Sequence, residues 1–85
     1  MYNLTNAELA KIVEYIYNRY YSDFYGGIKN VKIKRCGSRL ISATCDGFLL
    51  CPIDIENEEI KMFINRPKMI RVVTKDEIDS ILATD

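Results

Sequence analysis

The sequence predicts an α+β domain, with a long N-terminal helix packed on a four- to five-stranded antiparallel meander sheet and a short C-terminal helix. Apolar residues recur at helical spacing near both ends of the chain and alternate with polar residues in between. A length of 85 residues is enough for one domain, which we take to span residues 1–85. Hydrophobic residues make up 48% of the chain and charged residues 28%, the balance of a folded protein rather than a disordered one.

A long helix is expected from about Asn6 to Tyr25. Thr5 and Glu8 have the spacing of a capping box, in which each side chain satisfies a backbone N–H of the first turn. Gly26-Gly27 follows, where a residue with positive φ commonly ends a helix. The apolar stripe that should face the core consists of Leu9, Ile12, Val13, Ile16, Tyr20 and Phe24.

Antiparallel strands are expected from Ile28 onward, because apolar and polar residues alternate there and turn dipeptides separate the runs. The turns are placed at Gly37-Ser38, Asp46-Gly47 and near Glu56-Asn57. The predicted strands are Ile28–Cys36, Arg39–Cys45, Phe48–Ile55 and Glu59–Asn65, with Met69–Val73 as a candidate fifth strand after the break at Arg66-Pro67.

A short closing helix follows the last strand. Thr74 and Glu77 form a second capping box, and Ile78, Ile81 and Leu82 give this helix a single apolar face. The chain shows no linker, repeat or low-complexity segment.

The turns set the register of the sheet, and the register decides which face each side chain occupies. A two-residue turn at Gly37-Ser38 pairs Ile33 with Ser42. The face toward the long helix is then expected to carry Val31, Ile33, Leu40, Leu49, Cys51, Ile53, Ile60, Met62 and Ile64. The opposite face is expected to carry Ile41, Ala43, Cys45, Phe48, Leu50 and Phe63, interleaved with Lys32, Lys34 and Lys61.

An apolar and basic outer face is unusual, because a sheet covered on one side normally presents polar residues to water on the other. Three interpretations remain open. The closing helix or an irregular segment covers part of this face, or the face binds a partner or a second copy of the chain, or the assumed register is wrong.

Tyrosine is concentrated in the long helix, where Tyr17, Tyr21 and Tyr25 step onto one flank. These side chains either seal the edge of the helix over the sheet or form a recognition surface, since tyrosine is enriched among residues that carry binding energy.

Composition argues against several classes of function. Twelve basic and twelve acidic residues give a net charge of zero, which predicts no general attraction to nucleic acid or to a membrane. The absence of histidine excludes His-based catalysis and His-ligated metal sites. The three cysteines, Cys36, Cys45 and Cys51, lack zinc-binding spacing and are expected to be free thiols. We therefore expect no metal, no cofactor and no enzyme activity.

The chain is rich in isoleucine, lysine, asparagine and tyrosine, whose codons are AT-rich, and this usage suggests an AT-rich genome such as that of a phage or mobile element. The protein resembles the single-domain inhibitors of such elements, including anti-CRISPR proteins, in its small size, its lack of catalytic motifs and its expected apolar surface. The resemblance implies a cytoplasmic module, acting in the host cytoplasm if phage-encoded, that occludes a host protein or nucleoprotein complex.

Under this hypothesis Ile41, Phe48, Leu50 and Phe63 are the apolar anchors, and Lys32, Lys34 and Lys61 orient the partner. The flank formed by Tyr17, Tyr21 and Tyr25 adds to the contact. One alternative is a module that binds single-stranded nucleic acid on the outer face. Another is a host subunit that forms a homodimer through the same face.

Overall fold

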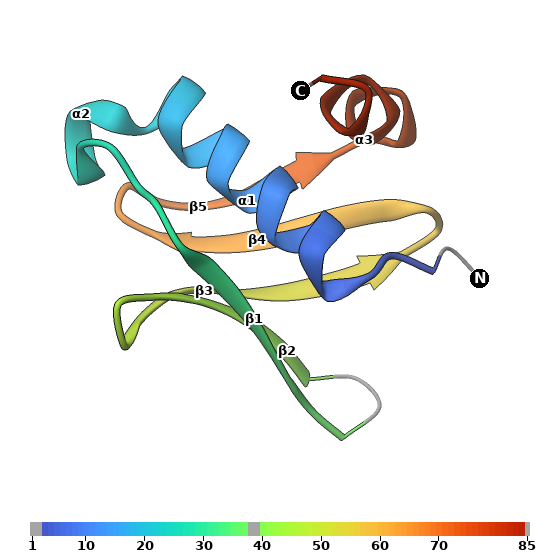
Figure 1. Ribbon diagram of the computed structural model, residues 1–85, viewed down its shortest axis with the longest axis horizontal. Coiled ribbons are helices and arrows are strands. Elements are labelled where there is room, and N and C mark those ends of the chain that lie inside the picture. Colours follow the sequence, from blue (N-terminus) through green and yellow to red (C-terminus); the bar gives the residue numbers. More distant parts are fainter. Residues whose placement is uncertain (1–2, 38–39, 85) are drawn as a thin grey trace.

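The computed structural model describes residues 3–37 and 40–84, and it confirms the predicted α+β architecture (Figure 1). Five antiparallel strands lie side by side in chain order, so the sheet is a meander with β1 and β5 at its edges. The elements are α1 (Asn6–Tyr20), α2 (Ser22–Tyr25), β1 (Val31–Cys36), β2 (Leu40–Cys45), β3 (Phe48–Glu56), β4 (Glu59–Asn65), β5 (Lys68–Val73) and α3 (Lys75–Leu82).

The helices α1 and α3 lie on the same side of the sheet. α1 crosses the sheet diagonally, and α3 packs against α1 (Figure 1). Ile78 and Ile81 of α3 belong to the same buried core as Ile12 and Ile16 of α1. The interpretation that the closing helix covers the opposite face is therefore wrong.

The predicted capping box starts α1. The Thr5 hydroxyl accepts from the Glu8 N–H at 3.1 Å, and the Glu8 carboxylate accepts from the Thr5 N–H at 2.9 Å. α1 ends at Tyr20, because Tyr21 leaves the helical region with φ −126° and ψ 20°, and α2 is a separate turn. Tyr20 is the last residue of α1 and Phe24 lies beyond the break in α2, and both are about half exposed, so their predicted place in the core stripe is wrong.

The β1–β2 connection is one residue longer than predicted. Ser38 lies outside the described residues, but the pairing of Cys36 with Leu40 leaves three residues in the loop instead of two. A one-residue change in register turns every side chain of a strand to the other face. Ile41 is therefore 7% exposed and faces the core with Ala43, whereas Leu40 faces outward, so the placement predicted for all three is wrong.

A β-bulge changes the register a second time, between β2 and β3. The turn at Asp46-Gly47 is as predicted, with positive φ at both residues. The pairing then shifts: Thr44 pairs with Leu49, but Ala43 pairs with Cys51. The extra residue, Leu50, turns toward the core and is 8% exposed, while Leu49 faces outward, so both predicted placements are wrong.

Phe48 also lies on a different face from the predicted one. Directly paired residues point to the same side of a sheet, and Phe48 pairs with Cys45, which packs against the core. Phe48 therefore lies on the helix side at the tip of the β2–β3 hairpin, where it is 75% exposed. The outer-face placement predicted for Phe48 and Cys45 is wrong.

From Cys51 onward, β3 and β4 keep the predicted faces. The β3–β4 turn is formed by Asn57 and Glu58, because Glu56 pairs with Glu59. This differs from the predicted register by two residues, which leaves the faces unchanged. The side chains of Ile53, Ile60, Met62 and Ile64 are buried, as predicted.

The tyrosine flank is largely interior. Tyr17 is completely buried and Tyr21 nearly so, and the Tyr17 ring makes edge-on contacts with Tyr21 and Tyr25 at 5.9 and 4.9 Å between ring centroids. The Tyr17 hydroxyl donates to the carbonyl oxygen of Leu50, the bulge residue, at 3.2 Å. Burial raises the pKa of Tyr17 far above its usual value, so the hydroxyl stays protonated and remains a donor.

We expect Tyr17→Phe to lower the free energy of unfolding by about 1–2 kcal/mol, because the buried Leu50 carbonyl loses its donor while the ring is kept. Tyr20→Phe is the matched control, since its hydroxyl is exposed, and it should change stability by less than about 0.5 kcal/mol. Denaturant unfolding measures both variants. Equal effects would mean that the Tyr17 hydroxyl does not support the bulge.

Candidate functional site

The outer face, the side of the sheet that points away from α1 and α3, is the main surface of this protein that its own helices leave open. Cross-strand pairing places exposed apolar side chains there from four strands. They are Leu40, Leu49, Pro52, Phe63, Ile70 and Val72. Phe63 pairs directly with Ile70, so these two side chains form the centre of the patch on β4 and β5.

The sheet divides into a fork within this face. β3 pairs with β4 only from Ile53↔Met62 to Glu56↔Glu59, although both strands continue beyond Ile53 and Met62. The rest of β3 pairs with β2 and the rest of β4 pairs with β5, so the two hairpin tips lie well apart at the left of Figure 1. The bulge at Leu50 lies where β3 diverges from β4.

A groove of about 530 Å³ occupies the fork. Its exposed lining includes Leu49, Pro52, Phe63 and Ile70, and the buried side chains of Leu50 and Ile64 contribute beneath them. Among the described residues that line it, Lys68 is the charged one. We call this feature the fork groove. Its chemistry is that of an apolar recess with a cation at the margin, which suits an apolar side chain of a partner.

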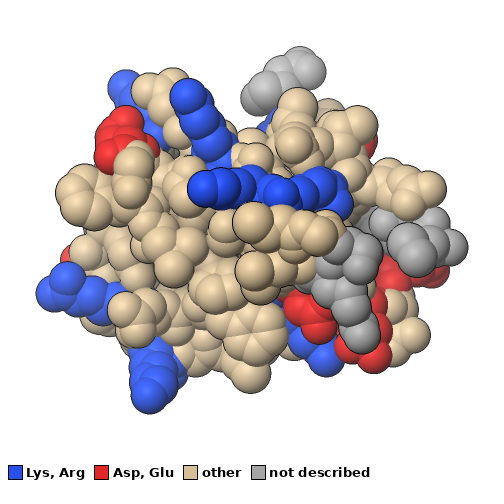
Figure 2. Space-filling model, turned by 90° about the horizontal axis from the view of Figure 1, so that it is seen from below, with Lys and Arg blue, Asp and Glu red and all other residues tan. Residues whose placement is uncertain are grey.

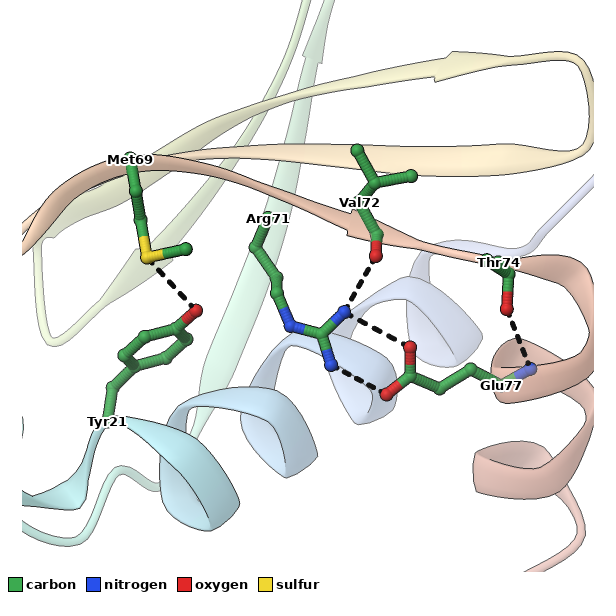
Figure 3. A network of polar contacts seen from close by, with 6 residues as sticks. All are labelled: Tyr21, Met69, Arg71, Val72, Thr74 and Glu77. Atoms are coloured by element: carbon green, nitrogen blue, oxygen red, sulfur yellow. Dashed lines mark hydrogen bonds and ion pairs between the residues drawn. The ribbon is translucent and has the colours of Figure 1, made fainter.

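Tyrosines of α1 and its extension support the fork from the helix side. Tyr17 bonds to the Leu50 carbonyl on β3, and the Tyr21 hydroxyl points to the Met69 sulfur on β5 at 3.4 Å (Figure 3). One helix edge thus holds the two separated hairpins at a fixed distance. Tyr17 and Tyr21 do not form the predicted recognition surface, because both are buried under the sheet, and Tyr25 is half-buried beside them.

Charge is segregated along the strands of the outer face. Glu56 and Glu59 pair at one end, next to Asp54. The fork end instead carries Lys68 on β5 and Lys32 and Lys34 on β1. Lys61 lies near the acidic end and forms an exposed ion pair with Glu56 at 3.8 Å. Seen from below, the molecule shows a broad uncharged area, with Lys and Arg side chains across its upper part and at its left margin and acidic residues toward the margins (Figure 2).

The edge strand β5 is partly closed on the helix side. The Arg71 guanidinium donates to the Glu77 carboxylate at 2.7 and 3.1 Å and to the Val72 carbonyl at 2.6 Å (Figure 3). It also lies 4.9 Å from the centre of the Tyr20 ring. The hydrogen bonds to Glu77 raise the pKa of Arg71, so the guanidinium stays charged. Because the Val72 carbonyl is already bonded, this edge is poorly suited to adding another strand.

The three cysteines are free thiols, as predicted, and two of them, Cys45 and Cys51, lie in environments that disfavour the thiolate. Burial raises the pKa of Cys51 to about 11. Burial, followed by the nearby Asp46 carboxylate, also raises the pKa of Cys45. A reactive thiol needs the opposite shift. Within residues 3–37 and 40–84, no three cysteine or carboxylate side chains lie close enough together to bind a metal ion.

The predicted site residues thus do not share one surface: Phe48 is exposed on the helix side, and Tyr17, Tyr21 and Tyr25 pack against the core. The structure brings Phe63, Lys61, Lys32 and Lys34 onto the outer face as predicted, but it buries Ile41 and Leu50 in the core. Sequence reasoning missed Leu49, Ile70, Val72 and Lys68. Ile70 and Val72 had a usable signal, because they alternate with Arg71 and Val73 in the candidate fifth strand.

Comparison with known proteins found no matching family model, no similar curated protein and no similar solved structure. No helix among the described residues is long and apolar enough to cross a membrane. Functional inference therefore depends on the geometry of the outer face.

In native protein at pH 8, Cys36 should react fastest with a thiol reagent, because it is exposed, and Cys51 should react only on unfolding. Cys45 should be intermediate, since it is half-buried and its pKa is raised. Peptide mapping after timed alkylation measures the order. Rapid labelling of Cys51 in the folded protein would contradict the buried position of the bulge.

Proposed function

We propose that this protein is a small, non-enzymatic protein-binding module whose outer face covers a surface of a host protein or nucleoprotein complex in the host cytoplasm. The proposal extends the resemblance to inhibitors of phages and mobile elements, including anti-CRISPR proteins. The observation that carries it is an exposed apolar patch on the face that α1 and α3 leave open. The patch consists of Leu49, Phe63, Ile70 and Val72. Contiguous apolar surface of this kind commonly marks an interaction site.

The geometry gives each part of the face a role. Phe63 and Ile70 are paired anchors that a partner can desolvate completely, and the fork groove beside them accepts an apolar side chain. Lys32, Lys34 and Lys68 lie toward one end and attract an acidic partner surface, which raises the association rate more than it lowers the dissociation rate.

Single-stranded nucleic acid is the second candidate, because Phe63 lies on the same face as several lysines. It is less favoured for two reasons. Phe48, the other aromatic expected to stack on bases, lies on the helix side of the sheet. The acidic group of Asp54, Glu56 and Glu59 also interrupts any basic track along the strands.

Replacing Phe63 and Ile70 together with serine should weaken partner binding by about thirtyfold or more, the usual effect of truncating central anchors. Folding should persist, because both side chains lie outside the core. Phe24→Ser is the matched control, since Phe24 is a half-exposed aromatic away from the outer face. The measurement is titration of each variant against the purified partner, which is first identified by affinity capture from host lysate.

A partner that binds the double variant as tightly as the wild type would contradict the proposal. A fluorescent oligothymidine titrated at several salt concentrations tests the alternative. We expect no tight binding to it, whereas affinity that falls steeply with salt would favour the nucleic-acid function.

A further inference from the structure

We propose that, when no other partner occupies it, the outer face is covered by the outer face of a second copy of this chain, with the strands of the two copies running in opposite directions across the interface. The inference uses the same surface as the proposed function but does not depend on a foreign partner. It rests on self-complementary charge, on the position of the apolar patch and on the closure of the β5 edge.

The charges match only in the antiparallel arrangement. A two-fold axis that lies in the interface, perpendicular to the strands, places the fork end of one copy over the β3–β4 turn of the other. Lys68, at the fork end of β5, then approaches Glu59 of the second copy, at the turn end of β4. A two-fold axis along the strands and through the middle of the sheet would instead place β5 over β1 of the second copy, so Lys68 would approach Lys32, a like charge. The net charge of zero means that two copies do not repel each other as a whole.

The apolar patch lies where this arrangement needs it. Phe63 and Ile70 pair between the acidic end and the Lys68 end, so the axis brings them near Lys61 and Val72 of the second copy. Sheets packed face to face in this way place side chains from both inner faces into one core layer ~10 Å thick. The fork groove supplies the recess into which a side chain of the second copy fits.

The available area predicts a weak dimer. Five strands spaced about 4.8 Å apart and about 20 Å long present roughly 480 Å² per copy. This projected area is small beside an interface that buries ~800 Å² of accessible surface per partner, so we expect a weak dimer. Edge pairing through β5 is disfavoured as a second route, because Arg71 already occupies the Val72 carbonyl.

Sedimentation velocity from about 5 µM to about 1 mM tests the inference directly. The wild type should convert from monomer to dimer across this range, and Ile70→Lys should weaken the dimer at least tenfold by placing a charge in the patch. Phe24→Lys adds the same charge to a similarly exposed apolar residue away from the outer face and should leave the dissociation constant unchanged. A wild type that stays monomeric, or an equal effect of both variants, overturns the inference.

A charge exchange tests the orientation. Lys68→Glu and Glu59→Lys should each weaken the dimer severalfold, and the double variant should restore it to within about threefold, because the two-fold axis recreates both contacts with the signs reversed. Failure of the double variant to recover overturns the antiparallel arrangement. A monomeric result with intact partner capture would remove this inference alone, whereas a dimer with no capture would remove only the proposed function.

Discussion

The hydrogen bond from the Tyr17 hydroxyl to the Leu50 carbonyl is the contact on which the rest of the structure depends. Leu50 is the extra residue of a bulge, so its backbone lacks the regular ladder that serves its neighbours. A buried carbonyl without a donor costs about 1–3 kcal/mol, and Tyr17 removes this cost. Once the bulge is stable, Leu50 and Cys51 can both face the core, and β3 turns away from β4.

The fork in the sheet follows from that divergence and explains the many tyrosines. The β2–β3 and β4–β5 hairpins separate, and this leaves space between them and the helix. Aliphatic side chains from one helix would be too short to reach both hairpins. Tyr17 reaches β3 and Tyr21 reaches β5, with a polar atom at the far end of each ring. Edge-on contacts among Tyr17, Tyr21 and Tyr25 fill the volume between them. Tyr17, Tyr21 and Tyr25 thus meet a packing requirement of this sheet, whereas Tyr15 and Tyr20 are exposed.

The sequence was sufficient to predict the elements but not the phase of two strands. The capping box of Thr5 and Glu8 located the start of α1, and alternation located β4 with its correct faces. Thr74 located the start of α3, but only half of the predicted second box forms there: the Thr74 hydroxyl accepts from the Glu77 N–H, while the Glu77 carboxylate pairs with Arg71. In β2, however, Leu40 and Ile41 are both apolar, and β3 begins with the continuous run Phe48-Leu49-Leu50-Cys51. Either phase of such a run offers apolar residues to the core. The longer loop and the bulge therefore left no trace in the pattern, and Ile41 and Leu50 were assigned to the wrong face.

These two shifts also bear on what the outer face can bind. The predicted face placed Phe48, Leu50 and Ile41 near Lys32 and Lys34 of β1, an arrangement suited to bases and phosphates. The bulge and the longer loop remove those three apolar side chains from the face, and the centre of the apolar patch is now the pair of Phe63 and Ile70 on β4 and β5.

The distance across the sheet separates the basic edge from this apolar centre. Because β1 and β5 are opposite edges, four strand spacings apart, the β1 lysines lie about 15–20 Å from Phe63 and Ile70. A nucleotide needs its stacking surface and its phosphate contact within one residue's reach. The β1 lysines lie too far from Phe63 for this, which leaves Lys68 and Lys61, and Lys61 is paired with Glu56. A folded protein surface is rigid over that distance and can contact the apolar centre and the basic edge together, which is why we propose a protein as the partner.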